Sequence, residues 1–142
     1  MSTEIRCDLC ELHTDVRWIF TIDTFTVVVD QQAVTYPQND AWGVCQACRD
    51  DIEDDEATSI MARRHRRLLM TDPNLASWPQ DLLRSAYQVL DVVILGAITH
   101  RHRDSWRAYT ASDRRQAQAG LDRDGERGAA FQPYSFPWKL DL

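Results

Sequence analysis

The sequence predicts an α+β protein: a small N-terminal unit of β-strands, then two or three helices, and finally an extended C-terminal tail. Three observations lead to this prediction. All four cysteines lie within the first 48 residues, and strand-type alternation of apolar and polar residues follows the first two of them. Apolar residues recur at helical spacing between residues 78 and 105. The last residues combine aromatic side chains with prolines, which exclude a regular helix.

The cysteines form two Cys-x-x-Cys pairs, Cys7 with Cys10 and Cys45 with Cys48, and none is left over. Two intervening residues allow a tight turn to bring both sulfurs of a pair onto one metal ion, while N–H groups of the turn donate to the thiolates. Two such pairs suit one tetrahedral Zn²⁺, and four sulfur ligands leave no open position for catalysis. We therefore predict one structural Zn²⁺ bound by these four residues.

Redox dithiols, disulfides and a catalytic or iron site are the alternatives. A redox Cys-x-x-Cys pair usually begins a helix after a strand, and nothing before Cys7 supplies such a strand. A secreted disulfide framework would follow a signal peptide, and MSTEIRCDLC contains no apolar stretch of that kind. These observations favour zinc, and they lead us to expect a cytoplasmic protein.

With these pairs, residues 5 to about 55 resemble the treble-clef and zinc-ribbon families, which combine a knuckle, a β-hairpin and a second knuckle or first helical turn. The loop between Cys10 and Cys45 is longer than the roughly 15–20 residues of compact sites, a length that an inserted hairpin explains. The resemblance implies the ligand role of the four cysteines. Because these families include nucleic-acid binders, adaptors and metal-stabilised subdomains, it does not define a function.

Residues 16–30 are expected to form two strands, joined at Asp23-Thr24 without the Asn-Gly type of turn that favours a tight hairpin. Residues 31–40 are polar, contain Pro37 and are expected to form a loop. Residues 42–44 are expected to form a short third strand that leads into the second cysteine pair. Together these elements make residues 1–55 the predicted zinc-binding unit.

Residues 56–110 are expected to be the helical region. The helical pattern that begins near residue 50 is expected to break at Asp54-Asp55, where an aspartate would cap a second helix. Pro73 ends that helix, and Ser77 with Gln80 fits a capping box for a long helix that spans 78–105.

The long helix carries apolar residues nearly all round, so it must be buried nearly all round. Either the zinc unit and the tail cover the apolar residues of this helix, or a second copy of the chain or another protein covers them. Residues 111–142 are expected to contain one short helix, a charged loop and an extended aromatic strap, which lies over the chain's own core or docks on a partner. The predicted partner interface comprises Val89, Val92, Leu95, Phe131, Tyr134, Phe136 and Trp138.

Charge is distributed unevenly within the net −6. Residues 1–60 carry thirteen acids and three arginines, whereas residues 61–142 carry nine acids and thirteen bases. The acidic half would repel a phosphate backbone, so any contact with DNA or RNA is expected from the basic half. The alternative is that these arginines complement helix C-termini. The candidate nucleic-acid contacts are Arg63, Arg64, Arg66, Arg67, Arg101, Arg103 and Arg107.

Motifs of catalysis are not found in the sequence: it has no phosphate-binding glycine loop, no nucleophile elbow and no HExxH, and HRD at 102–104 lacks the flanking kinase motifs. The longest apolar run, VVILGAI, is far shorter than the roughly 18 residues of a membrane span. We therefore expect a non-enzymatic, zinc-stabilised interaction or adaptor protein that docks on a larger protein assembly or self-associates, with no membrane partner and no small-molecule substrate. The alternative is a DNA- or RNA-associated regulatory or accessory factor that uses the arginines at 63–67 and 101–115.

Overall fold

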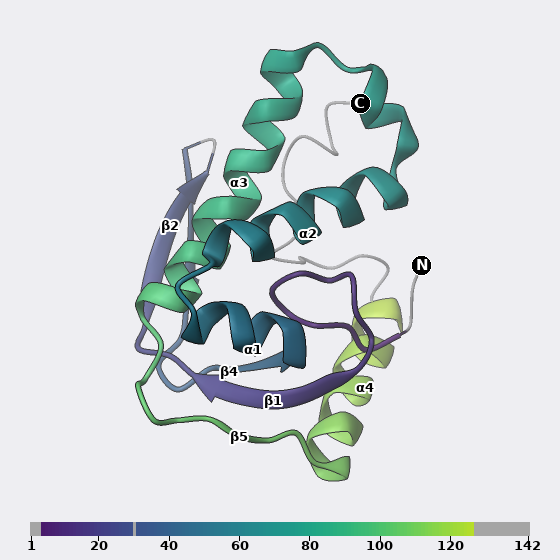
Figure 1. Cartoon of the computed structure of the whole chain (residues 1–142). Coiled ribbons are helices and arrows are strands. Elements are labelled where there is room, and N and C mark those ends of the chain that lie inside the picture. Colours follow the sequence, from purple (N-terminus) through teal and green to yellow (C-terminus); the bar gives the residue numbers. More distant parts are fainter. Residues whose placement is uncertain (1–3, 30, 127–142) are drawn as a thin grey trace.

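The computed structural model describes residues 4–29 and 31–126, which Figure 1 draws as a coloured ribbon. Strands and helices are mixed along this part of the chain, which confirms the α+β class. In chain order the elements are β1 (Val16–Thr21), β2 (Phe25–Val29), β3 (Gln32–Tyr36), β4 (Ala41–Cys45), α1 (Gln46–Glu53), α2 (Ala57–Thr71), the 3₁₀ helix η1 (Pro73–Ser77), α3 (Gln80–Thr99), β5 (Arg107–Ala108) and α4 (Ala111–Glu126).

The strands form two separate sheets. β1 is the middle strand of an antiparallel sheet in the order β4-β1-β5, and β2 pairs with β3 in a hairpin inserted between β1 and β4. The strands expected within residues 16–30 are therefore present, but they do not pair with each other. The polar loop expected for residues 31–40 is wrong at residues 32–36, which form β3.

Hydrogen bonds at the junction between β1 and β2 explain why the chain changes sheet there. The N–H of Asp23 donates to the carbonyl of His100 at 2.8 Å, and the N–H of Thr24 donates to Oε1 of Gln38 at 2.9 Å. The hydroxyl of Thr24 also donates to the carbonyl of Tyr36 at 2.7 Å. Because these groups bond to distant segments, the junction cannot close a tight hairpin of its own.

The break expected near Asp54-Asp55 is confirmed, since α1 ends at Glu53 and α2 begins at Ala57. Asp55 has a φ of 55°, a conformation that neither helix can continue. The expected aspartate cap is wrong: α2 begins after Glu56 without a side-chain cap. The break turns α2 back across α1, so that α1 lies between the sheet of β1 and β4 and helix α2 (Figure 1).

Helix α3 is shorter at both ends than the predicted 78–105. The capping box is wrong, because the hydroxyl of Ser77 donates to the carbonyl of Asn74 within η1 and no side chain caps α3. At the other end, the N–H of His102 donates to the carbonyl of Thr21 at 2.8 Å, and Arg101 pairs with Ile22 in an isolated bridge. Pairing with the end of β1 thus draws the chain out of the helix.

A continuous apolar core extends from the cysteines through the sheets to α1, α2 and α3. Helix α3 lies beside α2 and β2 and buries one face against them (Figure 1). By length and composition α3 is also apolar enough to cross a membrane, a test that core helices of water-soluble proteins pass as well. The buried residues of α3 are Ala86, Leu90, Val93, Ile94 and Ala97.

Helix α4 extends to Glu126, so residues 121–126, which were expected to begin a charged loop, are helical. Its first turn is closed reciprocally: the N–H of Asp113 donates to the hydroxyl oxygen of Thr110 at 3.2 Å, and the N–H of Thr110 donates to Oδ2 of Asp113 at 2.8 Å. Hydrogen bonds from Arg107 hold the pKa of the Asp113 carboxyl well below its usual range. The aromatic strap and its four predicted interface residues, Phe131, Tyr134, Phe136 and Trp138, lie outside the described residues.

Candidate metal centre

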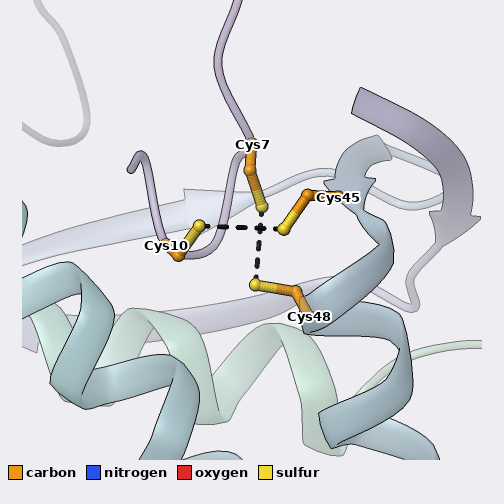
Figure 2. A group of neighbouring side chains, drawn as sticks. All are labelled: Cys7, Cys10, Cys45 and Cys48. Carbon is orange, nitrogen blue, oxygen red and sulfur yellow. Dashed lines mark hydrogen bonds between the residues drawn. The ribbon is translucent and has the colours of Figure 1, made fainter. Parts of the chain in front are cut away.

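The four cysteines come together from three parts of the chain (Figure 2). Cys7 and Cys10 belong to residues 6–13, here called the metal loop; Cys45 is the last residue of β4, and Cys48 lies in the first turn of α1. All four side chains are buried. Their Sγ atoms lie within 4.8 Å of one another and point toward a common centre.

Distances between the sulfurs suit a tetrahedral ion. The Sγ atoms of Cys7 and Cys48 are 3.6 Å apart, and those of Cys10 and Cys45 are 3.9 Å apart. A metal–sulfur distance of about 2.3 Å in a regular tetrahedron gives sulfur–sulfur edges of about 3.8 Å. The predicted cysteine cluster is therefore confirmed as a group that can hold one metal ion.

Backbone hydrogen bonds shape the metal loop. The N–H of Cys7 donates to the carbonyl of His13, and the N–H of Glu11 donates to the carbonyl of Cys7, each at 2.9 Å. Glu11 has a φ of 52°, a left-handed conformation that favours glycine. Its carboxylate pairs with the buried guanidinium of Arg64 on α2. This contact gives a reason for a charged residue at a position where glycine would be less strained.

A second set of hydrogen bonds ties the metal loop to β4. The N–H of Asp8 donates to the carbonyl of Gly43 at 2.8 Å, and the N–H of Gly43 donates to Oδ2 of Asp8 at 2.7 Å. Gly43 also has little room for a side chain, because a Cβ there would lie 3.0 Å from Cγ1 of Val16 and 3.1 Å from Cε2 of Tyr109. The reciprocal pair places Cys7 and Cys10 against the strand that carries Cys45.

Two side chains outside the cluster reach its sulfurs. Nη2 of Arg63 donates to Sγ of Cys48 at 3.2 Å and forms an ion pair with Asp51 at 2.7 Å. Nδ1 of His13 lies 3.3 Å from Sγ of Cys45. Four thiolates around a divalent cation carry a net charge of about −2. Donors of this kind disperse that charge and orient the ligands.

Burial of the thiols favours a cation at their centre. Burial is the first cause that raises the pKa of the Cys7 thiol well above its ordinary value, and contacts with the other three cysteines raise it further. Four adjacent thiols cannot all ionise without a compensating positive charge. A metal ion supplies that charge and displaces the protons, so its binding is expected to strengthen as pH rises.

Arg63→Gln is expected to weaken metal binding about 10–100-fold, because it removes a donor to Cys48 and leaves Asp51 without its partner. The affinity is measured by competition with a chromophoric chelator. Arg66→Gln is the matched control, since Arg66 lies in the same turn of α2 and is exposed. Equal affinities of the two variants would show that Arg63 is not a supporting residue of this site.

The arginines predicted to contact nucleic acid have varied surroundings. Arg63 contacts Cys48 and Asp51 of α1, Arg64 pairs with Glu11 of the metal loop, and Arg67 is partly buried. Arg66 is exposed. Sequence reasoning missed the pairing of these arginines with Asp51 and Glu11, although acidic residues near both cysteine pairs were a signal.

The arginines after α3 lie on another part of the chain. Arg101 donates to the carbonyl of Ile98 at 2.7 Å, and Arg107 pairs with Asp113 at 2.8 Å. Arg103 is exposed. Several of the seven predicted arginines therefore already donate to carboxylates or carbonyls within the chain.

The three interface residues predicted on α3 differ in how far they are buried. Val89 is partly buried and packs against the chain's own core. Val92 and Leu95 are each 41% exposed. Residues three apart on a helix are neighbours on its surface, so Val92 and Leu95 form one small apolar area.

No protein-family model, curated protein or solved structure matches this chain. The case for a metal centre depends on the four sulfurs themselves: their burial, their mutual distances and the donors beside them. What these residues form is a closed, buried Cys₄ cluster suited to holding one metal ion.

Proposed function

We propose that this chain is a non-catalytic interaction protein whose N-terminal part is held together by one structural Zn²⁺. The observation that carries the proposal is the group of four buried Sγ atoms within 4.8 Å of one another. Zn²⁺ prefers tetrahedral sites, and sites with four cysteine ligands are structural because they leave no position for substrate or water. The ion would therefore stabilise the fold and take no part in a reaction.

The order of elements around the cluster supports a treble-clef arrangement for this unit. The metal loop supplies two ligands, β1 and β4 pair as the main hairpin, and α1 begins directly after Cys45 and supplies Cys48 from its first turn. The hairpin of β2 and β3 would be an insertion into that arrangement, and it accounts for the long separation between the cysteine pairs.

The exposed apolar area of α3 is the proposed protein-docking surface. Leu95→Glu is expected to weaken self-association or partner binding at least about tenfold, because a charge at the centre of a small apolar contact must be desolvated. The thermal midpoint should change only modestly, since Leu95 is already 41% exposed. Light scattering of the purified chain and co-purification from the native host measure the two forms of assembly.

Val28→Glu is the matched control, because Val28 is an apolar residue 70% exposed on β2 rather than on α3. Docking through α3 would be contradicted if Leu95→Glu and Val92→Glu weakened assembly no more than Val28→Glu does. Nucleic acid in the eluate, lost when the exposed Arg66 is neutralised, would favour the nucleic-acid alternative instead.

A further inference from the structure

We propose that Arg49, held between the indole rings of Trp18 and Trp106, anchors a docking site for an acidic side chain of a partner protein. Trp18 belongs to β1, Arg49 belongs to α1, and Trp106 directly precedes β5. These three residues are here called the Trp–Arg–Trp stack. The site goes beyond the proposed function, because it uses neither the metal ion nor the exposed apolar area of α3.

Two contacts fix the position of the guanidinium group of Arg49. Its Cζ atom lies over both indole rings, 4.0 Å from the centre of the Trp18 ring and 5.0 Å from the centre of the Trp106 ring. A cation over the face of an indole is attracted by the quadrupole of the ring. The otherwise flexible arginine side chain is therefore held in one orientation before any partner binds, which lowers the entropic cost of binding.

The indole rings are themselves held in place by hydrogen bonds to α1. Nε1 of Trp18 donates to Oε1 of Gln46 at 2.7 Å. Nε1 of Trp106 donates to Oε1 of Glu53, also at 2.7 Å. The ring of Trp106 also meets the ring of Phe20 edge to face, with 5.3 Å between centroids. Both rings are thus positioned by α1 and by the core beneath them.

The N–H groups of Arg49 are left without acceptors. Within residues 4–29 and 31–126, no group accepts a hydrogen bond from this guanidinium, and none of its nitrogens is sealed from solvent. Glu53 lies one helical turn further on, where it could pair with Arg49, but its Oε1 accepts from Trp106. Oδ1 of Asp50 accepts from Gln46 instead. The donors of Arg49 therefore stay available to a group from outside.

A single carboxylate suits these donors better than a phosphate does. The planar guanidinium presents its N–H groups as a fork that matches the two oxygens of a carboxylate. Four acidic residues follow Arg49 closely in the chain: Asp50, Asp51, Glu53 and Asp54. Their charge repels a phosphate dianion or a nucleic-acid backbone more strongly than it repels one negative charge. The expected ligand group is therefore the carboxylate of an aspartate or glutamate.

The indole rings favour a protein as the source of that carboxylate. Trp18 and Trp106 are partly exposed, so apolar ring surface borders the guanidinium group. Tryptophan and arginine are enriched among the residues that dominate the binding energy of protein interfaces. An acidic side chain with apolar neighbours would pair with Arg49 and cover the rings at the same time. A free small carboxylate would leave the rings uncovered.

Selection of short random peptides on the intact, zinc-loaded chain tests the proposal, with Arg49→Ala used to remove peptides that bind elsewhere. The selected peptides are expected to carry aspartate or glutamate beside an apolar residue. Titration with the strongest of them should shift the ¹⁵N Nε–H signal of Arg49 and the indole N–H signals of Trp18 and Trp106 in a saturable manner. Replacing its acidic residue by the corresponding amide is expected to weaken binding about tenfold or more, because a charge-assisted contact is lost.

Three variants of the chain test the role of the stack. Arg49→Lys keeps the charge but loses the planar fork, so it is expected to bind the peptide about tenfold more weakly. Arg17→Lys, at an exposed position of β1 beside Trp18, is the matched control and should bind as the parent chain does. Glu53→Gln keeps an acceptor for the indole of Trp106 and removes a nearby negative charge. It should therefore bind more tightly at low salt, an effect that a purely structural stack would not show.

The assignment fails on any of four results: selected peptides without acidic residues, equal binding of the acidic peptide and its amide, equal binding by Arg49→Lys and Arg17→Lys, or no saturable shift. Displacement of the peptide by an equal concentration of acetate would assign the site to free small carboxylates and overturn a protein partner. Displacement by a single-stranded oligonucleotide would overturn it in favour of nucleic acid. Zinc content and the binding of Leu95→Glu, which should equal that of the parent chain, separate this site from the metal centre and from docking on α3.

Discussion

Removal of the metal ion is expected to unfold the N-terminal half of this protein rather than to loosen one loop. The four cysteines belong to the same buried core as Leu9, Phe20, Val44 and Ile52. Structural zinc contributes about 10–16 kcal/mol in small zinc-binding peptides, which is comparable with the whole stability of a typical domain, about 5–15 kcal/mol. Without the ion, the shared ligation that joins the metal loop to β4 and α1 is lost.

The measurement is a chelator titration followed by circular dichroism and by tryptophan fluorescence, to which the buried Trp42 contributes. Elemental analysis determines the zinc content of the starting protein. Cys48→Ser should reproduce the loss without chelator. Ala47→Ser is the matched control, since it places a serine in the same turn between two ligands. An unchanged melting curve after complete loss of metal, or a preparation that is folded and free of metal, would refute a structural role for the ion.

The local features of this unit were predictable because each depends on short-range chemistry. Two pairs of cysteines at Cys-x-x-Cys spacing indicate a shared ion before any fold is known. The break between α1 and α2 lies in a run of acidic residues, where Asp55 adopts a positive φ. The alternation along β1 and β2 likewise indicates strands whatever their partners are.

The partners of those strands were not predictable, because pairing is decided by contacts between distant residues. β1 pairs with β4 and with β5, and β5 follows α1, α2 and α3 in the chain. Nothing near Asp23 in the sequence reveals that its N–H donates to the carbonyl of His100. The same holds for the end of α3, where the bond from His102 to Thr21 competes with another helical turn.

The arginines of α2 show how a local explanation and a tertiary one can coexist. Basic residues are favourable in the later turns of a helix, and the sequence supports that interpretation for residues 63–67. The structure adds specific partners for two of them: Asp51 of α1 pairs with Arg63, and Glu11 of the metal loop pairs with Arg64. Arg64 is 5% exposed, so this pair depends on the packing of α2 against the loop and not on surface charge alone.

Gly96→Ala is expected to destabilise the protein by up to about 2 kcal/mol, although alanine is the better helix former. A Cβ at Gly96 would lie 2.5 Å from Cε2 and 2.9 Å from Cδ2 of Phe25. The ring cannot move aside easily, because it stacks on Tyr36 at 4.8 Å and on His100 at 5.3 Å between centroids. Overpacking of this kind costs about 1–3 kcal/mol, and the higher helix propensity of alanine returns about 1 kcal/mol of it.

Chemical denaturation of the metal-loaded chain measures this effect, and a double-mutant cycle with Phe25→Leu tests its cause. The smaller leucine leaves room for the new methyl group, so Gly96→Ala should cost less, or even stabilise, in the Phe25→Leu background. Thr99→Ala, at an exposed position of the same helix, should stay within about 0.5 kcal/mol of the parent. If the cost of Gly96→Ala is the same in both backgrounds, the close approach of α3 to β2 is not its origin. A cost that disappears with Phe25→Leu would tie the position of α3, and so the placement of its exposed apolar area, to the inserted hairpin.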